Sequence, residues 1–278
     1  MESTQTNEST VVVTGASRGL GAVMAHHLAD HGFRVFAGMR HPRPSAHRRI
    51  VPVALDVTDR SSIAAAADAV AAHVGPRGLT ALVNNAALLE AGPLELADAG
   101  QVWRHLATNV EGPLATSQAL LPLLRAGRGR IVNVSSVNAQ LPLPFWGLYS
   151  ASKAALVALS DALRVELAPA GVGVTVVTLG AYATDVRRRA LTGWPQGNGY
   201  DEARNAAAAL VSLLDATAAA PAEVGDTVVE LLTSAVAPAH RALGEGIEDL
   251  LALASQSPEV RDAALAELHA AASAFAGS

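Results

Sequence analysis

The sequence predicts an α/β fold in which helices cover both faces of a parallel β-sheet. Short β-branched apolar segments alternate with longer segments whose apolar residues recur at helical spacing. Glycine-rich or polar turns follow several of the short segments, and ligands in such sheets bind beyond the carboxyl ends of the strands. A chain of 278 residues is long enough to form one domain of this kind with a large core.

Strands and helices are predicted in alternation along the chain. The first strand is followed by a helix that Gly32 ends, because glycine readily takes the backbone conformation that follows a helix. Pro169 and Gly171 end the helix before the sixth strand. Residues after about 203 are rich in alanine and are predicted to be helical. The predicted strands are residues 11–14, 34–38, 51–55, 79–83, 130–134 and 172–178, and the predicted helices include residues 61–73, 99–124 and 149–168.

A glycine-rich turn follows the first predicted strand. Gly15, Gly19 and Gly21 have the spacing Gly-x-x-x-Gly-x-Gly, and a helical pattern begins within the turn. Glycine lets the backbone turn sharply and approach a ligand, and the free N–H groups of a helix N-terminus bind phosphate oxygens. The turn therefore predicts a pyrophosphate site. A glycine turn without a nucleotide is the alternative, which the strand before it and the helix after it disfavour.

Lys153 is the only lysine among the 20 Lys and Arg residues of the chain. It follows Tyr149 by four residues, so both side chains project from one face of a helix. A positive charge beside a phenol favours the phenolate and lowers a pKa that is about 10 in an unperturbed tyrosine. We therefore expect Tyr149 to donate and accept a proton near neutral pH. Tyr-x-x-x-Lys alone also arises by chance on helix surfaces, so the prediction needs the motifs that follow.

Three further motifs accompany these two. Asn84-Asn85-Ala86-Ala87 follows the fourth predicted strand, Asn109 lies within the segment 99–124, and Ser135-Ser136 follows the fifth predicted strand, with Ser136 13 residues before Tyr149. In this order the five motifs resemble the short-chain dehydrogenase/reductase family, from about residue 10 to about residue 184 and more loosely to about residue 244. Ala87 stands where the family pattern has glycine. Leu179 stands where it has proline, so the loop after the sixth strand is expected to be less rigid.

The resemblance implies a Rossmann-type doubly wound parallel sheet flanked by helices, with an Ala-rich helical C-terminal extension. It implies that Ser136 and Tyr149 bind the oxygen of a carbonyl substrate, with Ser135 as the alternative to Ser136. Tyr149 then delivers the proton, Lys153 binds the nicotinamide ribose and lowers the tyrosine pKa, and Asn109 holds a water that links Lys153 to solvent. The implied cofactor-binding residues are Gly15, Ser17, Arg18, Gly19, Leu20, Gly21, Arg40, Asp56, Val57, Asn85, Ala86, Tyr149, Lys153, Gly180 and Thr184.

The residues after the second strand favour NADP(H) over NAD(H). NAD-specific relatives carry an acidic residue there that binds the ribose, whereas this chain has Met39 followed by Arg40. No Asp or Glu lies between residues 31 and 55, and five arginines do. Arg18 in the glycine-rich turn adds another, and arginine binds phosphate in a bidentate manner, which suits a 2′-phosphate. A solvated basic loop is the alternative for Arg43, Arg48 and Arg49.

Aromatic residues between residues 145 and 200 predict an apolar substrate pocket. Six of the ten aromatic residues of the chain lie there, several of them on connecting segments, although packing in the core is the alternative. Residues 141–145 and 221–224 resemble the hydroxysteroid and retinol dehydrogenase branch, which implies a bulky lipophilic ketone, aldehyde or alcohol. The predicted pocket residues are Leu88, Leu143, Phe145, Trp146, Tyr182 and Trp194.

The chain is predicted to be one domain over residues 1–278, with a disordered tail at residues 1–9. A substrate lid is expected at about residues 184–201, where glycines and a proline disfavour regular structure, and a helical C-terminal extension at about residues 245–278. No signal peptide pattern or stretch of about 18 apolar residues is present, and a net charge of −5 argues against general nucleic-acid binding. We expect a cytoplasmic homodimer or homotetramer that acts on a small molecule and binds neither nucleic acid nor a membrane.

Three alternatives were weighed against these predictions. His26, His27 and His31 could suggest a metal site, but an exposed helix face is favoured and no metal is expected. The run 187–189 of three arginines suggests a solvated helix face, or else contact with an acidic substrate or the cofactor phosphates. The second functional hypothesis is an NADP(H)-binding regulatory or structural protein of this fold without turnover, which has no need of a proton relay.

Overall fold

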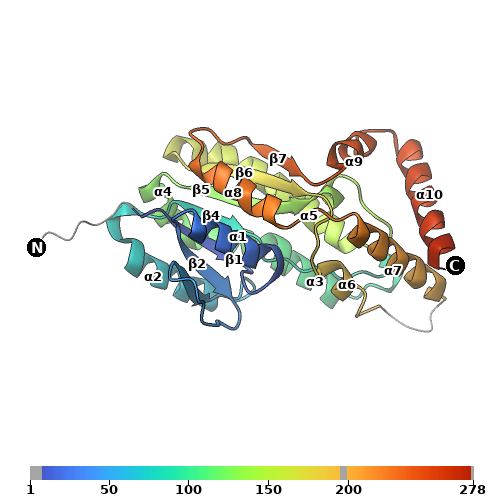
Figure 1. Cartoon of the computed structure of the whole chain (residues 1–278), viewed down its shortest axis with the longest axis horizontal. Helices are drawn as coiled ribbons and strands as arrows, with labels where there is room; N and C mark the ends of the chain where they lie inside the picture. Colours follow the sequence, from blue (N-terminus) through green and yellow to red (C-terminus); the bar gives the residue numbers. More distant parts are fainter. Residues whose placement is uncertain (1–7, 195–198, 277–278) are drawn as a thin grey trace, which may run out of the picture.

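The protein is a seven-stranded parallel sheet covered by helices on both faces (Figure 1). The computed structural model describes residues 8–194 and 199–276, with side chains described as far as residue 272. The strands lie in the order β3-β2-β1-β4-β5-β6-β7, and every pair is parallel. The strands are β1 (Thr10–Thr14), β2 (Arg34–Met39), β3 (Ile50–Ala54), β4 (Ala81–Asn84), β5 (Arg130–Ser136), β6 (Gly173–Leu179) and β7 (His240–Leu243).

Apolar residues that alternate along β1 are buried on opposite faces of the sheet. Val11 and Val13 pack in a core with residues of α1 and α8, whereas Val12 packs in a second core with residues of α2, α4 and α5. Burial on both faces explains why the strands appear in the sequence as continuous apolar segments. The helices are α1 (Gly19–Asp30), α2 (Arg60–Val74), α3 (Ala99–Leu106), α4 (Gly112–Gly127), α5 (Gly147–Leu167), α6 (Val186–Ala190), α7 (Asp201–Ala216), α8 (Ala222–Thr233), α9 (Ile247–Ala254) and α10 (Pro258–Ala276).

All six predicted strands are present within two residues of their predicted bounds, whereas β7 was not predicted. β7 has four residues, begins with His240 and Arg241, and pairs only with β6 at the edge of the sheet. Its first half is exposed, so the apolar pattern that marks the inner strands is absent. β7 is a strand because it pairs with β6, and this pairing between distant segments cannot be read from the local sequence pattern.

The segment predicted as one helix over residues 99–124 is two helices joined by a π-helical turn. α3 ends at Leu106, the turn spans Ala107–Glu111, and α4 begins at Gly112. Pro113 has no N–H, so the carbonyl group four residues before it, that of Asn109, has no ordinary helical partner. π-helical turns often occur at functional sites.

The strand order reverses between β1 and β4. Strands β2 and β3 extend from β1 in one direction, and β4 to β7 extend in the other. The helices that follow β1 and β4, α1 and α4, pack on opposite faces of the sheet, and ligands in doubly wound sheets bind at the carboxyl edge of such a switch point. The glycine-rich turn follows β1, the Asn84-Asn85 turn follows β4, and the serine pair ends β5, so the fold gathers the predicted motifs at this edge.

The C-terminal helices lie at one end of the molecule (Figure 1). α10 packs along α7, where Ala272 contacts the cluster formed by Ala209 and Leu210. The predicted helical extension over about residues 245–278 is therefore confirmed as α9 and α10 within the described part. Among the described helices, none combines the length and the apolar character that crossing a bilayer requires.

Part of the predicted N-terminal tail, residues 1–9, contacts the folded chain. Residues 1–7 lie outside the described residues, but Glu8 accepts hydrogen bonds from Arg34 at 2.7 Å and from Arg49 at 2.6 Å. Thr10, at the start of β1, donates its amide to the Thr80 hydroxyl at 3.1 Å. Glu8, which was predicted to lie in the tail, is therefore held by two arginines.

Candidate active site

The glycine-rich turn is interlocked with the turn that follows β4. The Asn85 side-chain amide donates to the carbonyl oxygens of Thr14 at 2.9 Å and Gly15 at 3.3 Å. The Thr14 hydroxyl accepts from the backbone N–H groups of Asn85 and Ala86, each at 3.0 Å. A Cβ on Gly15 would lie 2.8 Å from the Ala86 Cα, and a Cβ on Gly21 would clash with the Gly15 carbonyl oxygen. Glycine is therefore required at both positions by close backbone approach.

The N-terminus of α1 is available to a ligand. α1 begins at Gly19, the preceding Arg18 is extended, and no side chain caps the first N–H groups. Ser17, Arg18 and Gly19 are exposed, and Gly19 has the positive φ of 56° that favours glycine. The Thr184 side chain lies 3.8 Å from where a Cβ on Gly19 would be, so the chain after β6 borders this turn.

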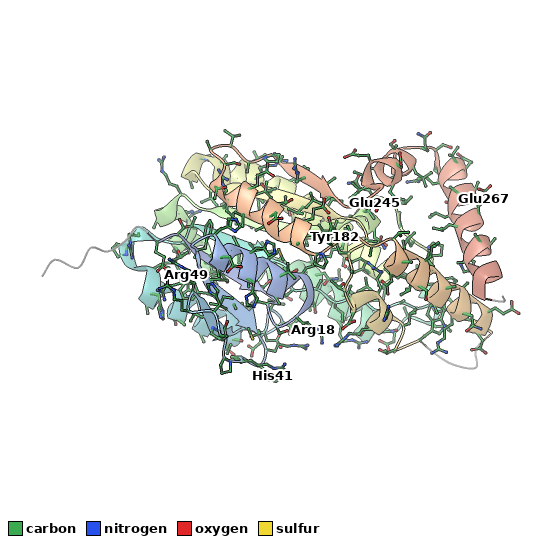
Figure 2. The ribbon with its side chains drawn as sticks, in the orientation of Figure 1. Arg18, His41, Arg49, Tyr182, Glu245 and Glu267 are labelled. Carbon is green, nitrogen blue, oxygen red and sulfur yellow. The ribbon has the colours of Figure 1, made fainter. Side chains whose placement is uncertain are left out.

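The residues predicted to recognise the cofactor phosphate separate into two groups. Arg40 is exposed directly after β2, and in Figure 2 the labelled Arg18 and His41 lie on the same side of the molecule. Arg49 lies elsewhere, where it donates to Glu8 and, at 3.0 Å, to the Gly32 carbonyl oxygen. Arg49 therefore stabilises the N-terminal segment, and Arg18 and Arg40 remain as the cations beside the turn.

Asp56 follows β3 at the same edge of the sheet. Its Oδ1 accepts from the Thr58 N–H at 2.9 Å and from the Thr58 hydroxyl at 2.7 Å. The neighbouring Val57 is buried, and its side chain lies 3.0 Å from where a Cβ on Gly112 would be. One carboxylate oxygen of Asp56 is thus used to hold its own turn, at a position suited to the adenine side of a dinucleotide.

Ser136, Tyr149 and Lys153 converge at the end of β5 and the start of α5. Tyr149 is 9% exposed and Lys153 is 2% exposed. The Lys153 Nζ donates to the Val134 carbonyl oxygen at 2.7 Å and lies 5.8 Å from the centroid of the Tyr149 ring. A lysine is almost never fully buried without a partner or a function.

The structure favours Ser136 over Ser135 as the partner of Tyr149. The Ser136 hydroxyl interacts with the Tyr149 phenol, and it also accepts from the Asn138 N–H at 3.2 Å. The Ser135 hydroxyl is buried and has no hydrogen-bond partner within the described residues. Successive side chains of a strand point to opposite faces, so only one serine of the pair can face the tyrosine.

The Tyr149 pKa does not lie below its ordinary value, as the neighbouring Lys153 led us to expect, because burial outweighs the groups that favour the phenolate. Burial raises the pKa of Tyr149 to about 12, and the Ser136 hydroxyl and the charge of Arg187 offset only part of that rise. Burial also lowers the pKa of Lys153 to about 8. Both groups lose solvation, and this loss opposes the charged form of each.

Asn109 is completely buried in the π-helical turn. Its Nδ2 donates to the Leu88 carbonyl at 2.8 Å and to the Ser152 hydroxyl at 2.9 Å, and its Oδ1 accepts from the Leu88 N–H at 2.7 Å. Both amide donors are therefore used. The side chain joins the chain after β4 to α5, and the Asn109 carbonyl oxygen, which lacks an ordinary helical partner, is the group suited to a water.

An aromatic cluster covers Tyr149. We define it as Phe145, Trp146, Tyr149, Trp194 and Tyr200, which pack together with Leu89 and Leu143. The Phe145 ring centroid lies 5.2 Å from that of Trp194 and 6.2 Å from that of Tyr200. Phe145 also has a φ of 66°, which is rare for a bulky residue and marks local strain of the kind found at functional sites.

Two of the six predicted pocket residues neither belong to the aromatic cluster nor pack against it. Tyr182 is a correction: it packs in the core beside α1 and α8, and its hydroxyl donates to Glu223 at 2.7 Å. Leu88 is held through its backbone by Asn109, and its neighbour Leu89 packs in the cluster instead. The period of an extended segment explains the exchange, because a shift of one residue reverses the direction of the side chain.

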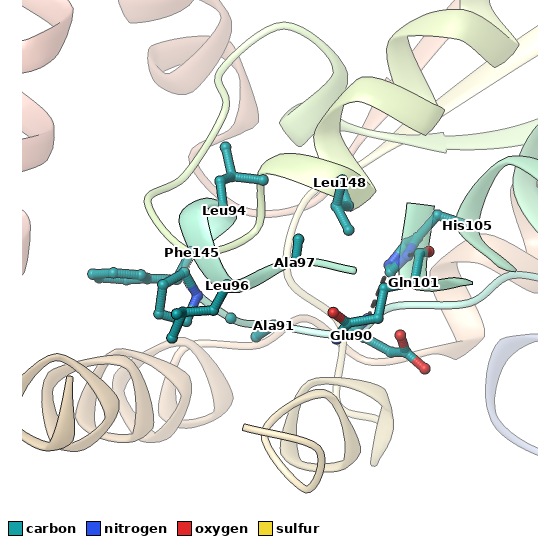
Figure 3. Close-up of a pocket in the computed structure, with 11 residues that line it drawn as sticks. Glu90, Ala91, Leu94, Leu96, Ala97, Gln101, His105, Phe145 and Leu148 are labelled. Carbon is teal, nitrogen blue, oxygen red and sulfur yellow. Dashed lines mark hydrogen bonds between the residues drawn. The ribbon is translucent and has the colours of Figure 1, made fainter. Parts of the chain in front are cut away.

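Two pockets border the aromatic cluster, and Phe145 lines both. The first encloses about 330 Å³, including space open to solvent, and lies against residues 90–97 and Leu148 (Figure 3). The second is lined by residues 143–146, by α7, and by Leu265, Leu268 and His269 of α10. Neither is lined by Ser136, Tyr149 or Lys153. Neither of these two pockets therefore leads directly to the phenol in this arrangement.

The predicted lid contains a short helix. α6 spans Val186–Ala190, and Ala190 and Trp194 pack in the aromatic cluster. The Tyr200 hydroxyl donates to Glu95 at 2.7 Å. Residues 195–198 of the predicted lid lie outside the described residues.

The family is decided by sequence comparison. The chain matches the short chain dehydrogenase family over residues 9–194. It belongs to this family. The match includes every predicted catalytic and cofactor-binding residue, from Gly15 to Thr184.

Relatives of this short-chain dehydrogenase include enzymes of the predicted branch. It is 36% identical over 192 residues to retinol dehydrogenase 5 of Mus musculus and 39% identical over 181 residues to 17-beta-hydroxysteroid dehydrogenase type 6 of Homo sapiens. These matches cover 66% and 63% of this chain but 60% and 57% of the relatives, less than two thirds of their length. The predicted resemblance to the hydroxysteroid and retinol branch is confirmed.

A solved structure covers more of the chain. The crystal structure of a short chain dehydrogenase from Burkholderia cenocepacia J2315 in complex with NADP is 30% identical, with a TM-score of 0.71 over 94% of this chain and 97% of that one. The predicted Rossmann-type fold is thereby confirmed over nearly the whole chain.

Several structural contributors of this short-chain dehydrogenase have no clear signal in the sequence. Thr14 and Ser152 hold Asn85 and Asn109 in place, yet each lies inside an ordinary strand or helix pattern. Arg187, expected on a solvated helix face, is 6% exposed. Of the histidines considered as metal ligands, His27 contacts a carboxylate instead, with its Nδ1 2.9 Å from Asp226 Oδ1. Within the described residues no group of three metal-binding side chains occurs.

Proposed function

We propose that this chain is an NADP(H)-dependent oxidoreductase that interconverts a carbonyl and an alcohol on a bulky lipophilic small molecule. The observation that carries the proposal is the convergence of Ser136, Tyr149 and the single, buried Lys153 at the carboxyl edge of the sheet. Membership of the short-chain dehydrogenase family supports the reaction class. The reduction of ketones and aldehydes is the direction that we favour.

The residues at the switch point fit a nicotinamide dinucleotide. Gly15 and Gly21 lie in a turn that has no room for a Cβ, and this turn precedes the uncapped N-terminus of α1. A pyrophosphate can approach the backbone N–H groups there. The exposed Arg18 and Arg40 suit a 2′-phosphate, because arginine binds phosphate in a bidentate manner. Asp56 and Val57 suit the adenine side, and Gly180 and Thr184 suit the nicotinamide side. The solved relative from Burkholderia cenocepacia J2315 holds NADP, which supports the same cofactor here.

Tyr149 supplies the proton in the proposed mechanism. The nicotinamide, when bound, supplies the hydride that reduces the carbonyl carbon. Ser136 and Tyr149 donate hydrogen bonds to the carbonyl oxygen, which stabilises the negative charge that develops there. A phenol whose pKa is raised to about 12 is fully protonated near neutral pH, so it is ready to transfer its proton to that oxygen.

Lys153 and Asn109 support this proton transfer. The Lys153 ammonium lies 5.8 Å from the Tyr149 ring, so it favours the phenolate that is left after the proton has moved. Its donors also suit the hydroxyls of the nicotinamide ribose. The Asn109 carbonyl oxygen can hold a water that returns a proton from solvent through Lys153.

The aromatic cluster suits a lipophilic substrate. Its residues present apolar surface next to Tyr149, and Trp194 carries a buried indole N–H with no hydrogen-bond partner in the part of the chain that is described. Apolar walls with few polar groups are typical of small-molecule pockets. The similarity to retinol and hydroxysteroid dehydrogenases supports the same class of substrate. Leu143, Phe145, Trp146 and Trp194 are the proposed contacts.

Turnover distinguishes this proposal from the alternative, an NADP(H)-binding regulatory or structural protein. The purified chain is incubated with NADPH and a panel of lipophilic ketones and aldehydes, and oxidation of the nicotinamide is followed by its absorbance. We expect turnover with at least one bulky carbonyl and none with Tyr149→Phe. NADPH binding without turnover across the panel would support the alternative. The cytoplasmic location and the assembly into a homodimer or homotetramer stay predictions.

A further inference from the structure

We propose that Arg187 is a positioning residue that holds the nicotinamide-side loop, residues 180–183, in place of the proline that the family pattern has at Leu179. The inference rests on the proposed function, because the loop borders the nicotinamide only if the chain binds NADP(H) at the switch point. It concerns a residue whose sequence context predicted a solvated helix face. Four sets of contacts carry it.

Arg187 is a buried cation with defined partners. Its side chain is 8% exposed, and it forms an ion pair with Asp215 of α7, whose side chain is 13% exposed. Nε and Nη2 donate to the same carboxylate oxygen at 3.0 Å and 2.6 Å. Burying an arginine is costly unless its charge and its donors are satisfied, so this pair has a fixed geometry.

The same guanidinium reaches the loop. Nη2 of Arg187 donates to the Tyr182 carbonyl oxygen at 2.9 Å in a buried contact. One planar group therefore joins α6, α7 and the backbone of the loop. Lysine has no planar fork with fixed donor directions, so it would not reproduce this arrangement.

Two other contacts hold the loop from the same side. The Ala183 N–H donates to the Ala219 carbonyl at 3.1 Å, and the Ala219 N–H donates to the Ala181 carbonyl at 3.0 Å. The Tyr182 hydroxyl donates to Glu223 at the start of α8 at 2.7 Å. The loop is thus held by the segment between α7 and α8, and Asp215 near the end of α7 orients Arg187 against it.

The opposite end of the loop is fixed to the sheet. The Gly180 N–H donates to the Leu243 carbonyl oxygen at 2.8 Å, so the unpredicted strand β7 anchors the start of the loop. A proline would restrict the backbone at a single residue. In this chain the loop backbone is restricted at both ends by hydrogen bonds and in the middle by Arg187. Hydrogen bonds and an ion pair thus take the place of the proline ring.

Arg187 also bears on the site through its charge. It lies within electrostatic range of Tyr149, where its charge favours the phenolate. No comparable role belongs to the adjacent Arg188, whose side chain is 71% exposed while its Nε donates to the other oxygen of Asp215 at 2.9 Å. The two arginines share one carboxylate, and only Arg187 contacts the loop. Arg188 therefore provides a matched control.

The test compares Arg187→Met with Arg188→Met. Hydrogen exchange is measured on peptides that cover residues 180–184 and 217–221, without any ligand. We expect Arg187→Met to raise exchange in both peptides by about tenfold or more, because the loop loses its central hydrogen bond. Arg188→Met should stay within about twofold of the unmodified chain. Unchanged exchange in Arg187→Met, or an equal rise in both variants, would overturn the proposal.

Cofactor affinity gives a second readout. General destabilisation of the fold would weaken the binding of both halves of the cofactor, whereas loss of the loop position should weaken only the nicotinamide half. Affinity is measured for NADPH and for its fragment without nicotinamide, 2′-phospho-ADP-ribose. Arg187→Met should weaken NADPH by about tenfold while the fragment changes by less than about twofold, because only the nicotinamide half borders the loop. Equal weakening of both ligands would show a structural defect and contradict the positioning role.

Two conservative variants keep the test decisive if Arg187→Met does not fold. Asp215→Asn keeps an oxygen acceptor and the side-chain volume but removes the charge that orients the guanidinium. It should raise exchange in residues 180–184 less than Arg187→Met does but clearly more than Arg188→Met. Arg187→Lys keeps the charge and should fail to restore wild-type exchange. Full restoration by lysine would show that charge alone suffices and would overturn the proposed geometry.

The two readouts separate this inference from the proposed function. Hydrogen exchange needs neither cofactor nor turnover, so it tests the contact even if the chain catalyses nothing. If NADPH and its fragment both fail to bind the unmodified chain, the proposed function fails while the exchange result stands. If NADPH binds and turns over normally in Arg187→Met, the proposed function stands and the positioning role fails.

Discussion

The two halves of the candidate site are built by different kinds of contact. On the cofactor side, backbone approaches backbone: Gly15 and Gly21 have no room for a Cβ, and Asn85 and Thr14 join two strand ends through four hydrogen bonds. On the substrate side, side chains pack against side chains from segments far apart in the sequence, with Phe145 between Trp194, Tyr200 and His269.

This difference shows which half can move. Backbone contacts at the turn have no alternative arrangement, because any shift breaks several hydrogen bonds together. Rings in the aromatic cluster can separate with the loss of packing and of the hydrogen bond from Tyr200 to Glu95, and the closed arrangement leaves Tyr149 only 9% exposed. We therefore propose that the cofactor side is a preformed cradle and that the substrate side is a cover that opens. The predictions below test this contrast, beginning with the groups that lie between the two halves.

Replacing Tyr149 by phenylalanine should have the largest effect. The change removes one oxygen at the boundary of the two halves, so kcat should fall by about 10²- to 10⁴-fold while NADPH affinity stays within about threefold. Steady-state kinetics on a good carbonyl substrate and an NADPH titration measure the two quantities. A near-normal kcat would place the proton donor elsewhere and withdraw the roles of Asn109, Ser136 and Lys153 as well.

Gly21→Ala tests the rigidity of the cofactor side. The added methyl group would clash with the Gly15 carbonyl oxygen, and backbone atoms cannot give way there. We expect NADPH affinity to fall by about 100-fold, close to 3 kcal/mol. Gly193→Ala is the matched control, since a Cβ at Gly193 would meet no atom within 4 Å. Equal losses in both variants would contradict the contrast between the two halves.

The buried Lys153 should give stability a distinctive pH dependence. Its folded pKa of about 8 lies below its unperturbed value of 10.5, so between these values the unfolded chain binds a proton that the folded chain does not. The free energy of unfolding should therefore rise with pH, relative to Lys153→Met, by about 2 kcal/mol from pH 7.5 to 9.5. Tyr149 acts oppositely above about pH 10, because its folded pKa is raised.

Urea unfolding of both proteins at the two pH values measures this difference. Groups other than Lys153 contribute equally to both curves and cancel in the comparison. A difference that does not change with pH would mean that Lys153 keeps its ordinary pKa in the folded protein.

Arg40→Asp tests the exposed rim of the cofactor side. The unmodified chain should bind NADP(H) at least about tenfold more tightly than NAD(H), a difference of about 1.4 kcal/mol. The substituted carboxylate should narrow or invert that ratio, because it repels a 2′-phosphate and accepts from a ribose hydroxyl. Titrations with both cofactors give the ratio. Equal affinities in the unmodified chain would contradict the preference.

Substitutions in the cover should have the smallest effect on cofactor binding. Trp194→Phe and Tyr200→Phe keep aromatic packing but remove the unpaired indole N–H and the hydrogen bond to Glu95. KM or the range of accepted substrates should change by several-fold, and NADPH affinity by less than about twofold. Low protection of residues 184–194 in hydrogen exchange without ligand would support a cover that opens. Protection equal to that of the sheet would contradict it.

Much of the site could be predicted because its motifs are local. The glycine spacing, the Tyr149–Lys153 pair and the serine pair each lie within a few residues, and the parallel sheet brings the ends of their strands together. The environment of these groups could not be predicted. The effect of burial on the pKa of Tyr149 depends on Trp146, Trp194 and other residues that cover it, and their positions follow from packing.

The sequence by itself determined the alternation of strands and helices, the family and the candidate catalytic residues, because each depends on short-range pattern. Tertiary structure alone decided which arginines are buried, where Tyr182 packs, and that β7 completes the sheet. Arg187 and Arg188 are neighbours of one type in one helix, yet one is buried and the other exposed. The partner that separates them, Asp215, lies 28 residues later, and only the folded chain brings it within 2.6 Å.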